Sequence, residues 1–169
     1  MSVGFSFRPS FAGEITVDHV PEDFLDRIEQ RVVSGLFLPG KRRRANYRVI
    51  ARNREALEFA AMDFATTYAI GLNHVVLRIG RDTVSYEVSF ARWTRTAMIH
   101  GAVIGLLLAI VFLVSPGDRI HSSLSWGMLA FWSLAWPWLL TAIHRPFAAR
   151  ALEAILREEL GDGSRHRAA

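Results

Sequence analysis

The sequence predicts an α+β protein: a small domain of strands and one helix, followed by two apolar helices that form a membrane hairpin. Residues 97–114 and 124–143 contain no Asp, Glu, Lys or Arg. Between residues 47 and 90, several segments alternate apolar and polar residues as half-buried strands do. Residues 21–34 instead carry apolar side chains at helical spacing. We therefore expect one sheet with one helix, tethered to a bilayer.

The first apolar segment, residues 97–114, is long enough to cross a bilayer. Eleven of its eighteen residues are Ile, Leu, Val or Phe, and a helix of this length spans about 27 Å. The one titratable side chain inside it is His100, near one end, where it can reach the interface. An ionisable group inside a membrane is a candidate functional residue.

The second apolar segment, residues 124–143, holds four of the five tryptophans. Trp126 fits an interfacial belt, and the other three lie deeper. Pro137 lacks the N–H that a helix needs and crowds the carbonyl of Ser133, so we expect a kink there.

Arginine placement predicts the orientation of the hairpin. The arginines closest to the two segments lie on one side: Arg78, Arg81, Arg92 and Arg95 before the first, and Arg145, Arg150 and Arg157 after the second. The loop of residues 115–123 holds only Arg119. Positive charge marks the cytoplasmic side, so both termini are expected in the cytoplasm. Nineteen of the twenty basic residues are arginine. We interpret this bias as typical of a GC-rich bacterial genome, which predicts a bacterial cytoplasmic membrane.

Small residues recur at every fourth position of the first segment: Ala97, Gly101, Gly105 and Ala109. They share one helix face and allow another helix to approach closely. That helix is either the second segment of the same chain or a helix of another subunit. The pattern favours neither, so self-association or other membrane subunits remain expected partners beside the lipid bilayer.

The cytoplasmic domain is expected to cover residues 1–93 and to begin with a strand. Val3, Phe5 and Phe7 alternate with polar or small residues, and alternation resumes after a break bracketed by Pro9 and Gly13. The region is either one strand with a bulge or a hairpin. The helix of residues 21–34 follows, with Pro21 in its first turn and Gly35 after its end.

The remaining strands are expected to form an antiparallel meander. Alternation is clear in residues 47–52, 57–61, 75–79 and 84–90. Residues 63–72 fit a helix or a strand equally well. A linker of three or four residues would then join the last strand to Ala97.

Two features predict contact between this domain and the membrane surface. Lys41, Arg42, Arg43 and Arg44 are consecutive cations, which attract anionic lipid when they lie near the inner leaflet. A solvated loop tip is the alternative interpretation. Trp93, just before the first span, is expected at the interface. No aromatic residues are interleaved with the cations, so nucleic acid is not an expected partner.

Residues 146–160 predict a C-terminal amphipathic helix that Pro146 opens and Gly161 ends. Its apolar face, which includes Leu152 and Leu156, would dock on the chain's own domain, on lipid or on a partner. Docking on the domain is the expectation, and residues 161–169 are expected to be disordered.

No standard catalytic, nucleotide-binding or metal-binding motif is present, and the chain has no cysteine. An acid–base group of Asn73 and His74 with Asp63 or Glu87 has no support from spacing. We therefore expect no enzyme, cofactor or metal site.

The expected function is that of a non-enzymatic accessory or scaffold protein that displays a cytoplasmic domain at the membrane. The alternative is a lipid- or ligand-responsive module with a pocket between sheet and helix. The aromatic residues that would line this pocket, or simply fill a core, are Phe5, Phe7, Phe59, Tyr86 and Phe90.

Overall fold

The computed structural model describes residues 8–37, 45–69, 72–114 and 123–165, and it has an α+β fold. Five strands form one antiparallel sheet in the order β1-β5-β4-β3-β2. The strands are β1 (Ser10–Thr16), β2 (Tyr47–Arg52), β3 (Ala56–Ala61), β4 (His74–Ile79) and β5 (Thr83–Ser89). β2 to β5 form the predicted meander, and β1 pairs with the outer edge of β5.

The first described strand does not break at Gly13. Instead, Gly13 lies within β1 and is in register with Tyr86 of β5. A Cβ atom at Gly13 would lie 2.2 Å from the Tyr86 hydroxyl oxygen. The glycine therefore makes room for a tyrosine ring. The break expected between Pro9 and Gly13 is instead part of β1, which pairs with β5 in unbroken register from Ser10 to Thr16.

Helix α1 (Phe24–Val33) packs on one face of the sheet through Phe24, Leu25 and Ile28, which are buried. Its end confirms the stop predicted at Gly35, which adopts a positive φ of 74°. The N–H of Gly35 bonds to the carbonyl of Val32, and the next N–H bonds to that of Arg31. This is the Schellman arrangement, which satisfies the last carbonyls of a helix.

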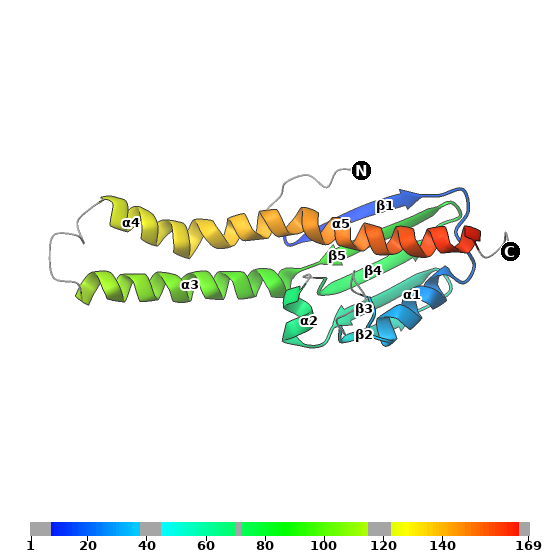
Figure 1. The fold of residues 1–169 in the computed structure, drawn as a ribbon, viewed down its shortest axis with the longest axis horizontal. Helices are drawn as coiled ribbons and strands as arrows, with labels where there is room; N and C mark the ends of the chain where they lie inside the picture. The colour runs from blue at the N-terminus through cyan, green and yellow to red at the C-terminus, as the bar shows by residue number, and fades with distance from the viewer. Residues whose placement is uncertain (1–7, 38–44, 70–71, 115–122, 166–169) are drawn as a thin grey trace.

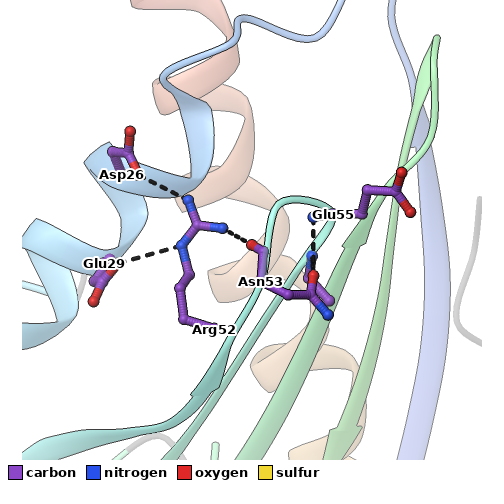
Figure 2. A network of polar contacts seen from close by, with 6 residues as sticks. Asp26, Glu29, Arg52, Asn53 and Glu55 are labelled. Atoms are coloured by element: carbon purple, nitrogen blue, oxygen red, sulfur yellow. Dashed lines mark hydrogen bonds and ion pairs between the residues drawn. The ribbon is translucent and has the colours of Figure 1, made fainter.

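The side chain of Arg52 joins the far end of β2 to α1, as Figure 2 shows. Its guanidinium donates to Asp26 at 2.7 Å and to Glu29 at 3.3 Å. Beside it, the Asn53 side chain accepts hydrogen bonds from the backbone N–H groups of the turn that leads into β3. All these groups are partly exposed, so each ion pair contributes at most about 1 kcal/mol.

The second helix on this face is the end of α5 (Trp136–Arg165), which runs from the apolar hairpin along the sheet (Figure 1). Leu152, Ile155 and Leu156 are fully buried in the core. The helix is continuous through Pro146 and past Gly161, so the separate helix expected over residues 146–160 is not present. Packing on both sides of Pro146, at Ala142 and at Leu152, outweighs the one hydrogen bond that the proline removes.

Helix α3 (Ala91–Val114) begins two residues after β5 ends, so the expected linker before Ala97 is helical instead. Residues 63–72, left open above, contain the short helix α2 (Phe64–Ala69) beside the base of α3 (Figure 1). The return path consists of α4 (Ser123–Ala130), the π-helical turn η2 (Phe131–Ala135) and α5. Domain and hairpin are thus joined by two unbroken helices.

Candidate membrane interface

The two apolar helices pack along the predicted row of small residues. A Cβ atom at Gly101 would lie 2.3 Å from Cγ of Pro137, and one at Gly105 would lie 2.6 Å from Cβ of Ser133. Both glycines are buried. No side chain larger than hydrogen fits at these positions without movement of the other helix.

The outer members of the row lie on the same side of α3. Ala97 is buried, and Ala109 is partly buried. The row therefore faces the chain's own second apolar segment, which is one of the two partners considered above.

The two helices run antiparallel. In each one, the point where charged residues give way to the apolar stretch, which we call its charge boundary, lies at the same level. The ring of Trp93 stacks on His144 with 4.1 Å between ring centroids. Arg95 is the last Asp, Glu, Lys or Arg in α3, and Arg145 is the first after Ser123. Each lies one or two residues from the stacked pair, so at about 1.5 Å per residue the boundaries coincide within about one turn.

Beyond this level both helices are apolar and largely exposed. From Arg95 to Val114 the helix rises about 29 Å, which matches the hydrocarbon thickness of a bilayer. Both helices are long and apolar enough to cross a membrane, and only 17% of each apolar window is buried. A core helix of a soluble protein would be mostly buried, so these helices differ from that class.

The distortion expected from Pro137 takes the form of the π-helical turn η2. The N–H of Trp136 bonds to the carbonyl of Phe131, five residues back. The following residue, Pro137, has no N–H to donate. The hydroxyl of Ser133 donates to the carbonyl of Leu129 at 2.5 Å. The turn lies directly opposite Gly101 and Gly105, at the closest approach of the two helices.

Asn73 joins the sheet to the first turn of α3. Its side-chain oxygen accepts a hydrogen bond from the backbone N–H of Trp93 at 2.9 Å, and its amide nitrogen donates to the carbonyl of Thr67 at 3.2 Å. Its backbone N–H and carbonyl bond to Ser89 and Ala61. Every polar group of this buried residue is used, so Asn73 fixes α3 relative to β3, β5 and α2.

Sequence reasoning gave Asn73 no structural role because an isolated asparagine at the start of a strand resembles a turn residue. The acid–base group imagined around it is not assembled. His74 lies 2.8 Å from Glu58 on the neighbouring strand instead. Among the described residues, no three His, Asp or Glu side chains are close enough to hold a metal ion.

Trp93 is expected at the membrane interface, and its position relative to a membrane stays a prediction. The side chain is 7% exposed, because it packs between the domain and His144. Lys41, Arg42, Arg43 and Arg44 lie outside the described residues, so their expected lipid contact stays a prediction. His100 is exposed on α3 and makes an interaction there.

The other long helix is tied to the domain by polar contacts as well as by apolar packing. The Tyr86 hydroxyl donates to Glu153 at 2.6 Å. Burial and this carboxylate both raise the pKa of Tyr86, so the hydroxyl stays protonated at neutral pH. Near the end of α5, Glu158 and Glu159 pair with Arg31 of α1.

Three of the five aromatic residues considered for a pocket or a core lie in the core. Phe59, Tyr86 and Phe90 are 0–3% exposed, and Phe59 makes edge contacts with Phe37 and Tyr47. Phe5 and Phe7 lie outside the part of the chain that the structure covers. No protein-family model matches the chain, and the comparisons with curated proteins and with solved structures give no match either.

Proposed function

We propose that this chain is a two-span integral membrane protein that holds its α+β domain in a fixed orientation at the cytoplasmic face of a bacterial membrane. The domain would act as a non-enzymatic scaffold or accessory subunit. The observation that carries the anchoring proposal is the coincidence of the two charge boundaries at the level of Trp93 and His144. Two helices that only packed against each other would not need the arginines that border their apolar stretches, Arg95 and Arg145, to lie at one level.

The scaffold role is supported by the stiffness of the attachment. A flexible tether would let the domain search a volume, whereas α3 and α5 continue from the apolar hairpin into the domain without a break. Such a connection fixes which surfaces face the membrane and which face the cytoplasm. This geometry suits the presentation of a binding surface to a partner in the same membrane.

The sheet face opposite α1 and α5 is a candidate for that binding surface. Side chains on this face alternate with the buried ones and include Glu87 and Arg78, both exposed, and the pair of Glu58 and His74. Charges of both signs on an open sheet favour a specific protein partner over a nucleic acid.

Impermeant cysteine labelling tests the anchoring, since the native chain has no cysteine. In intact cells, Ser122→Cys should react from outside, and Arg54→Cys in the turn after β2 should react only after permeabilisation. The opposite pattern would overturn the orientation, and release of the chain by alkaline washing would overturn the insertion.

Mild detergent extraction followed by mass spectrometry tests the scaffold role. A partner protein should copurify with the wild type and be lost when Glu87 and Arg78 are exchanged as E87R/R78E. A small molecule that copurifies in place of a protein would support the ligand-responsive alternative instead.

A further inference from the structure

Helix α2 and the residues just before it expose large apolar side chains and bury polar ones. This is the reverse of what is expected of a helix in water. Thr66 and Thr67 are 4% and 5% exposed, whereas Met62 and Phe64 are 52% and 63% exposed. Single exposed apolar residues are common on protein surfaces. Two large ones beside two buried threonines are unusual and call for an explanation.

The buried side of α2 is held by specific hydrogen bonds, so this orientation is built into the fold. The backbone N–H of Asn46 donates to the Thr66 hydroxyl at 2.8 Å. The side chain of Asn73 donates to the carbonyl of Thr67. At the start of the helix, Asp63 accepts from the N–H of Thr66 at 2.7 Å. To turn Phe64 inward would break these bonds.

Helix α2 lies at the end of the domain from which the long helices project (Figure 1). Met62 follows Ala61, whose carbonyl accepts a hydrogen bond from the Arg92 guanidinium at 3.0 Å. Arg92 and Arg95 are exposed in the first turns of α3. Apolar side chains beside exposed cations, next to an apolar helix, match the composition of an interfacial membrane contact.

We infer that Met62, Phe64 and Ala65, which we call the α2 surface, rest in the headgroup region of the bilayer, with Arg92 and Arg95 facing anionic lipid. The inference rests on the proposed membrane anchoring. It explains why apolar residues are exposed on this helix, and it gives the domain a third contact with the membrane besides α3 and α5.

The test uses the full chain in nanodiscs that contain nitroxide-labelled lipids. Single cysteines carry a fluorophore at Ala65→Cys, at Val103→Cys in α3 and at Arg54→Cys in the far turn. Nitroxide near the headgroup should quench the label at position 65, and nitroxide on the acyl chain should quench the label at 103. The label at 54 should be quenched by neither. Quenching at 65 should be stronger with anionic than with zwitterionic lipid.

The three labels separate failure of this inference from failure of the anchoring. No quenching at position 103 would overturn the anchoring itself. Quenching at 103 with no more at 65 than at 54 would overturn the contact of the α2 surface alone. Equal quenching at 65 in anionic and zwitterionic lipid would overturn the role given to Arg92 and Arg95.

Removal of the apolar side chains provides the matched comparison. M62S/F64S should lower quenching at position 65 and leave quenching at 103 unchanged. Ile50→Ser, at a position 55% exposed on β2, should change neither. Unchanged quenching at 65 in a double variant that melts like the wild type would contradict the inference. If that variant does not fold, the comparison of positions 65 and 54 in the single-cysteine proteins decides.

Discussion

The side chain of Asn73 accepts a hydrogen bond from the backbone N–H of Trp93, 2.9 Å away, in the first turn of α3. The first four N–H groups of a helix have no partner within the helix. Here one of them is satisfied by Asn73, which lies twenty positions earlier in the chain and directly before β4. The buried side chain of Asn73 is therefore one of the contacts that hold the start of α3 against the domain.

Replacement of Asn73 by alanine should destabilise the protein by about 1–3 kcal/mol, because the N–H of Trp93 and the carbonyl of Thr67 would lose a buried partner. Thermal unfolding of the full chain in detergent would measure this loss. Asn53→Ala is the matched control, since its side chain makes two hydrogen bonds in an exposed turn. Equal effects at the two positions would show that Asn73 has no special role at the junction.

The docked end of α5 should contribute as much to domain stability as any core residue of the sheet. Leu152→Ala leaves a cavity at a position with no exposure and should cost about 2–5 kcal/mol. The same substitution at Leu113, which is 77% exposed at the tip of α3, should cost little. A melt of Leu152→Ala that equals the wild type would mean that α5 only rests on the domain.

The α+β class, the meander and the two long apolar helices could be predicted from the sequence, because they depend on hydrophobic periodicity and on the absence of charge. These signals are local and strong. The stop of α1 at Gly35 was predictable for the same reason, since only a few residues adopt its φ without strain.

The errors have a common physical cause, which is that tertiary contacts override local signals. Gly13 and Pro146 are ordinary breakers in isolation, yet Gly13 accommodates the ring of Tyr86, and Pro146 lies between two buried stretches of α5. No sequence window could reveal that Trp93 would stack on His144 across the two helices. The intrachain position of the row at Gly101 likewise required the antiparallel register.

Asp63, which caps the start of α2, should make the stability of the fold decrease at acidic pH. The backbone N–H of Thr66 holds the pKa of Asp63 below its usual value of about 4. A carboxyl with a lowered folded pKa stabilises the fold above the unfolded pKa, and this contribution is lost as pH falls through the folded pKa. Asp63→Asn should therefore show a smaller drop in melting temperature below about pH 4 than the wild type. Parallel curves for the two proteins would refute this role of the cap.

Replacement of Gly101 by alanine should destabilise the hairpin within one chain. The added Cβ would lie 2.3 Å from Pro137 and 3.2 Å from the carbonyl oxygen of Trp132, so the helices must separate. Overpacking of this kind costs about 1–3 kcal/mol. Gly127→Ala is the matched control, because no atom lies within 4 Å of the added Cβ, and a helical glycine replaced by alanine gains about 0.5–1 kcal/mol.

Melting and size analysis in detergent separate the two partners first considered for this row. Contact within the chain predicts a lower melting temperature for Gly101→Ala, a higher or equal one for Gly127→Ala, and the same particle size for both. If Gly101→Ala instead reduces particle size while its melt matches the wild type, the row binds a second subunit. In that case the close approach to Pro137 would not be the contact that the glycines serve.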